Sequence, residues 1–285
     1  MKRILILGGT RFIGKHLLYQ LDTMDYEIFY FHRGFTKLER HVTATEILGN
    51  RTCEQDLQRL FSLDYDIVID VSGEDYTMVE LSSKYAGPKQ PYYIYISSSS
   101  VYKASTKPHK ETDSLNIDSE SSYTQQKIQS ESLVQKCFHK YAIVRPSKIY
   151  GPYNHIYREN FFIDRIKAGK KIHIVSNPVL HFTYVLDLIS AILILIERQP
   201  IGIFNVAGKE PATVTTFIHT ISNLLAIPAN IIYSDTSDSP FSYLPNCVLD
   251  CTKIKDLCNW MPTYHLENGL SETIFFKEED SCGNK

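Results

Sequence analysis

The sequence predicts an α/β fold built on a doubly wound parallel sheet, with a smaller C-terminal region interleaved with that sheet. Three observations carry this prediction. Short β-rich runs alternate with helical patterns through the first half of the chain, a glycine turn "GGTRFIG" joins the first run to the first helix, and the pattern changes after Pro152. In such sheets ligands bind at the carboxyl ends of the strands.

The first half contains strand and helix patterns in alternation. The expected strands cover 3–9, 27–34, 65–73, 91–100 and 141–152, and the expected helices cover 14–24, 52–63 and 122–138. The last of these helices, "SYTQQKIQSESLVQKCF", is predicted to be amphipathic. A polar stretch over 103–122 follows a central strand, where substrate loops tend to lie.

The second half is expected to interleave with the sheet. It is predicted to contain a helix and strand over 159–175, a strand and buried helix over 181–197, a short strand over 202–208 and a helix over 213–227. We therefore expect a dinucleotide-binding domain over 1–152 with a returning segment near 181–205, a substrate-binding region over 153–180 and 206–276, and a frayed tail over 277–285.

Composition limits the class of protein. The formal net charge of −2 gives no electrostatic reason to expect nucleic acid, whose partners usually carry a basic surplus. The apolar start is interrupted by Gly8, Gly9 and Arg11, so it does not read as a signal peptide, and the run Leu188–Ile196 is too short to span a bilayer. No membrane association and a cytoplasmic location are expected.

The cysteines show neither a CxxC pair nor a paired histidine motif. Reduced, scattered thiols are therefore expected rather than disulfides, and no metal site is predicted. The six positions are Cys53, Cys137, Cys247, Cys251, Cys258 and Cys282.

The glycine turn predicts a dinucleotide site of the Rossmann type. Gly8, Gly9 and Gly14 allow a tight turn and a close approach of a pyrophosphate to the backbone. Arg11 stands where the commonest fingerprint has its middle glycine. The other residues of the turn are expected to line the same site: Thr10, Phe12 and Ile13.

The end of the second strand indicates which cofactor binds. NAD-binding proteins usually place an acidic residue there, whereas this strand ends in His32 and Arg33. A guanidinium can hold the extra phosphate of NADP by two charge-assisted hydrogen bonds, and Arg11 could be a second clamp. NADP(H) is the predicted cofactor; the alternative is that Arg33 is a solvated surface charge.

Tyr123 and Lys127 are candidate catalytic residues. They stand four residues apart on an expected helix, so both project from one face. A cation beside a phenol is expected to lower the pKa of the phenol, which then exchanges a proton with a carbonyl or alcohol oxygen while nicotinamide transfers hydride. "SSSSVY" offers hydroxyl groups that could hold the reacting oxygen.

These motifs resemble the extended short-chain dehydrogenases/reductases, a family that includes nucleotide-sugar epimerases, dehydratases and reductases. The resemblance covers nearly the whole chain. It is carried by the glycine turn and, in order, "ISSSSVY", "YTQQK", "VRPSKIYGP", "HFTYVLDL", "FNVAG" and "LDCTKIKDLCNWMP". The glycine turn itself resembles a subgroup with chloroplast stem-loop-binding proteins and uncharacterised bacterial reductases.

The resemblance implies roles for particular residues. Ser98 is the family's catalytic serine, and Tyr123 and Lys127 are its tyrosine and lysine. By the same analogy Lys127 holds the nicotinamide ribose, the backbone near Pro146 contacts the carboxamide, and Asn50 joins the cofactor site.

Two departures from the motifs of the family limit the reactions and substrate contacts that we expect. Sugar 4,6-dehydratases carry Asp-Glu where this chain has Ser99 and Ser100, which disfavours a dehydratase. Leu180 replaces an arginine that often holds a substrate phosphate, so Lys148, Arg158 or Arg165 would have to replace it. The predicted substrate-binding set is Ser99, Ser100, Tyr102, Lys148, Tyr150 and Arg158, and Tyr157 is a further aromatic candidate.

We therefore predict an NADPH-dependent reductase of a keto group on a nucleotide-linked sugar, with a dTDP-4-keto-6-deoxyhexose as the first candidate. An epimerase with tightly bound cofactor and an RNA-binding member of the same fold remain alternatives. A homodimer is expected from the family resemblance and from the helix that bears Tyr123.

Overall fold

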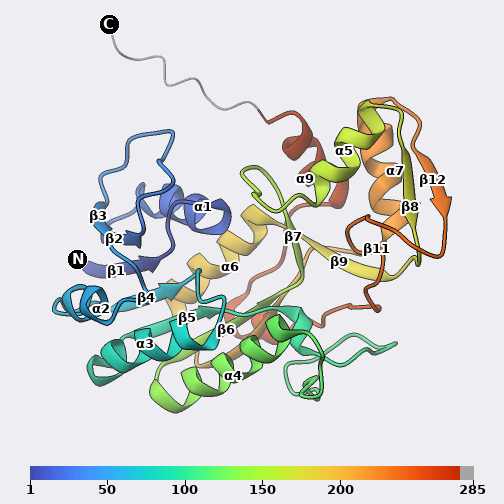
Figure 1. The fold of residues 1–285 in the computed structure, drawn as a ribbon. Coiled ribbons are helices and arrows are strands. Elements are labelled where there is room, and N and C mark those ends of the chain that lie inside the picture. The colour runs from blue at the N-terminus through green and yellow to red at the C-terminus, as the bar shows by residue number, and fades with distance from the viewer. Residues whose placement is uncertain (277–285) are drawn as a thin grey trace, which may run out of the picture.

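A computed structural model describes residues 1–276 and contains one large parallel sheet (Figure 1). Its strand order is β10-β6-β5-β4-β1-β2-β3, and all neighbouring pairs are parallel. The strands are β1 (Lys2–Leu7), β2 (Tyr26–His32), β3 (Thr45–Leu48), β4 (Ile67–Asp70), β5 (Tyr92–Ile96), β6 (Tyr141–Pro146) and β10 (Gly202–Val206). This confirms the doubly wound α/β fold.

Helices cover both faces of the sheet because successive strand residues point to opposite sides. Ile4 and Ile6 of β1 belong to one apolar cluster, and Leu5 and Leu7 belong to the other. The first cluster includes α1 (Phe12–Leu21) and α6 (Val185–Arg198); the second includes α2 (Glu54–Leu60), α3 (Tyr76–Ala86) and α4 (Ser122–Cys137).

The C-terminal region adds two small sheets beside the carboxyl edge of the large one (Figure 1). β9 (Val179–Tyr184) lies between β7 (Lys148–Tyr150) and β11 (Pro211–Thr213), and β8 (Lys171–Ile174) pairs with β12 (Asn230–Tyr233). The remaining elements are α5 (Glu159–Lys167), α7 (Val214–Leu225), α8 (Thr252–Cys258), α9 (Leu266–Ile274) and the 3₁₀ turns η1 (Gly87–Lys89) and η2 (Ser99–Val101).

The structure differs from the expected elements at three places. The strand expected over 141–152 is divided at Ser147 into β6 and β7, which belong to different sheets. Among the longer elements, β3 and α3 in the first half and β11, β12, α8 and α9 in the second half were not expected. The strand expected from His181 belongs to the small sheet, while β10 alone of the returning segment joins the large one. The division into two functional domains stays a prediction.

Helix α4 is not amphipathic in the expected sense, because its buried face is largely polar. The buried residues of this helix are Thr124, Lys127, Ser130, Glu131 and Val134. Tyr123 is its one strongly exposed large hydrophobic residue. The predicted dimer through this helix therefore gains no support from an apolar face.

Two further expectations concern the chain as a whole. The tail over 277–285, including Cys282, lies outside the described residues. Within the described residues no helix is long and apolar enough to cross a membrane.

Candidate active site

Tyr123 and Lys127 lie on α4 at the carboxyl edge of the large sheet. The Lys127 Nζ is 5.8 Å from the centre of the Tyr123 ring, and it donates hydrogen bonds to the carbonyl oxygens of Gly73 (2.8 Å) and Ile96 (2.9 Å). Lys127 is 4% exposed, whereas Tyr123 is 48% exposed. The lysine is therefore fixed inside the protein, and the tyrosine can be reached from solvent.

Burial controls the charge of Lys127. Desolvation lowers the pKa of Lys127 to about 8, although the nearby Asp70 carboxylate opposes this shift. The ammonium form still predominates at pH 7. An ammonium has three N–H donors, so one remains after the two carbonyl contacts.

The expected lowering of the Tyr123 pKa was wrong for this structure. Burial of the phenol raises the pKa of Tyr123 above its usual value, while a hydrogen bond with Ser98 and the charge of Arg158 act in the opposite direction. Lys127 directs two of its donors to backbone carbonyls instead. A phenol that keeps its proton is suited to act as an acid.

Three serines gather where β5 ends. Ser98 caps η2, because its Oγ accepts a hydrogen bond from the Ser100 amide at 3.2 Å. The buried Oγ atoms of Ser99 and Ser100 have no hydrogen-bond partner among the described residues. Unpartnered buried hydroxyls are costly, so their presence beside Tyr123 favours a site for a polar ligand.

The glycine turn forms a compact cradle at the start of α1. Gly8 has a φ of +98°, and a Cβ placed on Gly14 would lie 1.8 Å from the Gly8 carbonyl oxygen. Only glycine permits this approach of helix to strand. Thr10 and Phe12 are buried within the turn, and Ile13 packs against the core. The turn therefore fits a pyrophosphate at the helix N-terminus.

Arg11 and Arg33 lie at the same edge of the sheet. The Arg11 Nε donates to the Thr36 hydroxyl at 3.0 Å, and the Arg33 guanidinium lies 5.3 Å from the centre of the Phe35 ring. Neither guanidinium forms an ion pair within residues 1–276. Both are therefore free to bind an anion.

His32 is already engaged and is less available to a cofactor than expected. It is 9% exposed, stacks on Tyr30, and its Nε2 lies 2.8 Å from the Glu46 carboxylate. Glu46 comes from β3, which the sequence pattern did not indicate. An acidic residue thus does lie near the end of β2, and it is paired with His32.

Asn50 and Pro146 occupy the carboxyl ends of β3 and β6. The Asn50 Oδ1 accepts hydrogen bonds from the Thr52 amide (3.1 Å) and hydroxyl (2.9 Å), and Pro146 is buried. Next to Asn50, the buried Arg51 guanidinium forms a bidentate ion pair with the Asp70 carboxylate, with N···O distances of 2.6 and 2.8 Å. This ion pair joins the segment after β3 to the end of β4.

Lys148 and Arg158 are two basic residues near the candidate site, and the charge of Arg158 acts on Lys148. Lys148 is partly buried on β7, and its ammonium makes no hydrogen bond or ion pair with the described residues. Burial lowers the pKa of Lys148, and the charge of Arg158 lowers it further, while Cys247 opposes the shift. Because Arg158 also acts on Tyr123, the two cations lie near the candidate acid.

Tyr102, which was expected to contact the substrate, is instead buried and bonded to other residues of the protein. Its ring is 6% exposed and stacks on His109, and its hydroxyl donates to Asn205 (2.6 Å) and accepts from Arg145 (2.9 Å). Arg145 also donates to the Glu131 carboxylate of α4 and, at 3.3 Å, to the carbonyl oxygen of Glu111. Tyr102 is therefore part of a structural network.

The three other aromatic and basic candidates are also engaged elsewhere. Tyr150 is 3% exposed and packs on Tyr184 and Phe217 in the core. Arg165 forms a 2.6 Å ion pair with Asp238, and the exposed Tyr157 donates to Asp164. All three side chains therefore already have protein partners, whereas the sequence analysis expected them to contact a substrate.

Sequence reasoning missed two titratable residues near the candidate site, Glu74 and His155. Glu74 follows β4, and its charge raises the pKa values of Tyr123 and His155. The exposed His155 lies near Arg11 and Arg158, whose charges lower its pKa together with burial. Neither residue belongs to a local motif, so only the tertiary structure brings them to the site.

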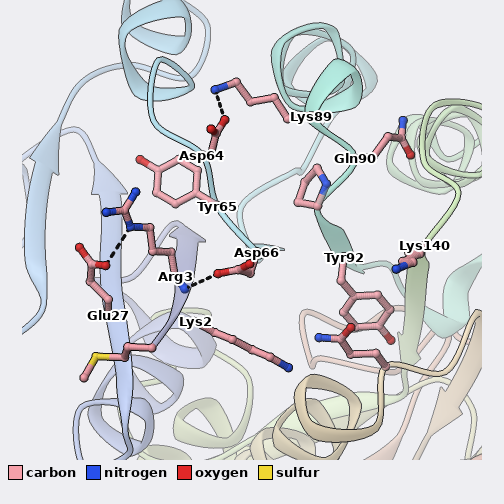
Figure 2. Close-up of a pocket in the computed structure, with 13 residues that line it drawn as sticks. Lys2, Arg3, Glu27, Asp64, Tyr65, Asp66, Lys89, Gln90, Tyr92 and Lys140 are labelled. Carbon is pink, nitrogen blue, oxygen red and sulfur yellow. Dashed lines mark hydrogen bonds and ion pairs between the residues drawn. The ribbon is translucent and has the colours of Figure 1, made fainter.

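A separate hollow of about 730 Å³ lies at the amino edge of the sheet, away from Tyr123 (Figure 2). It is lined where strands begin, by residues such as Arg3, Asp66 and Tyr92. No group of three or more potential metal ligands occurs in the part of the chain that the structure describes. The hollow is thus distinct from the candidate active site.

Comparison with known proteins agrees with this geometry. A model of the NAD dependent epimerase/dehydratase family matches residues 75–207, which include Ser98, Tyr123 and Lys127. The matched segment belongs to that family. The resemblance to the extended short-chain dehydrogenases/reductases is therefore confirmed.

Individual relatives extend the likeness to most of the chain. The chain is 28% identical to the chloroplast stem-loop binding protein of 41 kDa b from Arabidopsis thaliana, over 95% of this chain and 78% of that protein. It is 24% identical to a UDP-N-acetyl-alpha-D-glucosaminuronate decarboxylase from Bacillus cytotoxicus, over 97% and 98%. A UDP-glucuronic acid 4-epimerase from Bacillus cereus, solved with UDP-glucuronic acid and NAD, superposes with a TM-score of 0.83 at 21% identity over 95% and 98%.

Proposed function

We propose that this protein is an NADPH-dependent reductase of a keto group on a nucleotide-linked sugar, with dTDP-4-keto-6-deoxyglucose as the first substrate to test. The observation that carries the proposal is the grouping of Ser98, Tyr123 and Lys127, with the charge of Arg158 acting on the same tyrosine. The known proteins that resemble the chain include several that act on nucleotide sugars.

The choice of NADPH rests on charge. Arg11 in the glycine turn after β1 and Arg33 at the end of β2 form no ion pair with the described residues, and a 2′-phosphate would supply the anion that both can bind. Glu46 is the nearby carboxylate that could instead accept ribose hydroxyls, but it is paired with His32. The epimerase of known structure cited above was solved with NAD, so the cofactor has to be measured directly.

The residues of this chain have separable tasks in the reduction. The glycine turn and the third N–H of Lys127 would hold a nicotinamide dinucleotide, and that cofactor when bound would supply the hydride for the reduction. Tyr123 donates its phenolic proton to the carbonyl oxygen, and Ser98 orients that oxygen by a hydrogen bond. Lys148 and Arg158 are placed to bind the diphosphate of the substrate. Solvent returns a proton to the exposed Tyr123 afterwards.

The test is direct. Purified protein is mixed with NADPH and dTDP-4-keto-6-deoxyglucose, and the absorbance of NADPH is followed while the product is identified by mass spectrometry. Substrate-dependent oxidation of NADPH supports the proposal. Absence of oxidation with both NADPH and NADH would reject a reductase.

Two alternatives are separated by their own readouts. An epimerase would release a nicotinamide dinucleotide only on denaturation and would interconvert UDP-sugars without net NADPH consumption. RNA binding is worth testing because the Arabidopsis relative is named for binding stem-loops. It predicts an affinity for a stem-loop RNA that falls steeply with salt.

The proposed assembly and location also need their own tests. The homodimer can be examined by light scattering, and the cytoplasmic location by fractionation. The polar surface of α4 gives no reason to favour a strong interface there.

A further inference from the structure

The segment after β4 is fixed against the catalytic helix. The Gly73 carbonyl oxygen accepts hydrogen bonds from the Lys127 Nζ at 2.8 Å and from the Tyr95 hydroxyl at 3.0 Å. Two residues beyond Glu74, the Tyr76 amide donates to the Gln126 side chain at 2.7 Å. Glu74 therefore lies between two fixed contacts with α4, and its backbone has little freedom to move away from Tyr123.

The Glu74 carboxylate is exposed and makes no hydrogen bond or ion pair with residues 1–276. Its negative charge acts on Tyr123, on Lys127 and on His155, which come from α4 and from the segment after β7. Arg158 acts on Tyr123 with the opposite sign, and it also acts on Lys148. The surroundings of Tyr123 thus include a basic group, Arg158, which also acts on Lys148, and an acidic group, Glu74.

We propose that Glu74 is a specificity-determining residue, which makes the sugar subsite accept neutral or protonated amino sugars and reject uronic acids. This rests on the proposed function, because it places a sugar carbonyl at Tyr123. A substrate whose diphosphate lies against Lys148 and Arg158 and whose carbonyl reaches Tyr123 brings its ring substituents beside Glu74. A hydroxyl or ammonium group there can donate a hydrogen bond to the carboxylate.

A sugar carboxylate in the same place meets a like charge. Two carboxylates in contact lie well within the Debye length of about 8 Å at physiological ionic strength, so screening by salt does not remove their repulsion. Among the described residues no cation is paired with Glu74 that could offset the effect. The preference therefore arises mainly from rejection of the wrong sugar rather than from added affinity for the right one.

The experiment compares binding of UDP-glucose and UDP-glucuronic acid by calorimetry, because the two ligands differ only at C6. The intact protein is expected to bind UDP-glucose about tenfold or more tightly than UDP-glucuronic acid. In Glu74→Gln this ratio is expected to fall to about threefold or less, mainly through tighter binding of UDP-glucuronic acid.

Asp75→Asn is the matched control. It removes a negative charge from the neighbouring residue, whose side chain caps α3 by accepting from the Met78 amide at 2.9 Å, and asparagine serves equally well as a cap. This variant is expected to keep the preference of the intact protein.

The outcomes separate the two proposals. Equal binding of both sugars by the intact protein, or an unchanged ratio in Glu74→Gln, would overturn the role of Glu74 while leaving the nucleotide-sugar assignment in place. Failure of the intact protein to bind either ligand or dTDP-glucose would overturn the nucleotide-sugar assignment, and the role of Glu74 with it.

Discussion

The two edges of the large sheet differ in the burial of the groups that lack a partner among the described residues. Lys2 and Lys140 at the amino edge form no ion pair but are exposed, whereas Lys148 at the carboxyl edge is partly buried and the hydroxyls of Ser99 and Ser100 there are buried. At the amino edge Arg3 pairs with Glu27 at 2.8 Å, and Lys89 pairs with Asp64 at 2.5 Å (Figure 2). At the carboxyl edge Lys148, Arg158 and Glu74 are left without ion pairs in the described chain.

This contrast favours the carboxyl edge of the sheet as the place where a ligand binds. A hollow of about 730 Å³ lies at the amino edge, but its acidic groups already have partners. The buried hydroxyls without partners, Ser99 and Ser100, lie at the carboxyl edge. Unpaired charge and unpartnered polar atoms are costly unless a ligand completes them, so they locate the site better than volume does.

The strongest test of the contrast is Tyr123→Phe. Loss of the proton donor should lower kcat for carbonyl reduction by about 10²- to 10⁴-fold with little change in stability. Tyr65→Phe is the control at the amino edge, where the hydroxyl donates to the Leu60 carbonyl oxygen. Equal activity of both variants in a steady-state assay would show that the site is elsewhere.

The next largest effect is expected from replacing Arg11 and Arg33 together by alanine. Two charge-assisted contacts to a 2′-phosphate would be lost, so NADPH should bind about 100-fold more weakly. NADH lacks that phosphate and should lose much less affinity. Fluorescence titration with both cofactors checks this; an equal loss for NADPH and NADH would contradict the predicted clamp.

Lys148→Met should separate function from stability. The variant removes a partly buried, unpaired ammonium, so the free energy of unfolding should rise by up to about 1 kcal/mol. Binding of the nucleotide sugar should weaken by about tenfold. Lys140→Met, at the exposed amino edge, should change neither quantity. Denaturant unfolding and calorimetry measure the two effects, and a destabilised variant with normal binding would assign Lys148 a structural role.

The smallest effects are expected at the paired charges of the amino edge. Arg3→Ala and Lys89→Ala break exposed ion pairs, so kcat/KM should change less than about twofold and the Tm very little. A large loss of activity in either variant would remove the distinction between the two edges.

Local patterns explain what could be predicted from the sequence. The glycine turn and the spacing of Tyr123 and Lys127 each depend on neighbouring residues in one element, and both were placed at the carboxyl edge as expected. β3 could not be seen because it is a mostly exposed edge strand. α3 buries two small polar residues, Ser82 and Ser83. The sequence of this helix therefore lacks the regular spacing of apolar residues by which a buried helix is recognised.

The remaining errors have tertiary causes. Tyr102 and Tyr150 look like available aromatic residues in the sequence, and only packing shows that they are buried. Glu74 is 49 residues from Tyr123 along the chain, so no rule of local spacing connects the two residues. The site of a parallel sheet is assembled from the ends of several strands, which a local pattern does not contain.

The Arg145 guanidinium has a consequence for which residues of the 103–122 loop can vary. One side chain binds Glu131 on α4, the Tyr102 hydroxyl just before the 103–122 loop, and the Glu111 carbonyl oxygen in the middle of that loop. Insertions or substitutions that displaced these two positions would also disturb the support of α4. Variation in the loop residues that Arg145 does not hold would therefore leave α4, and with it Tyr123, in place.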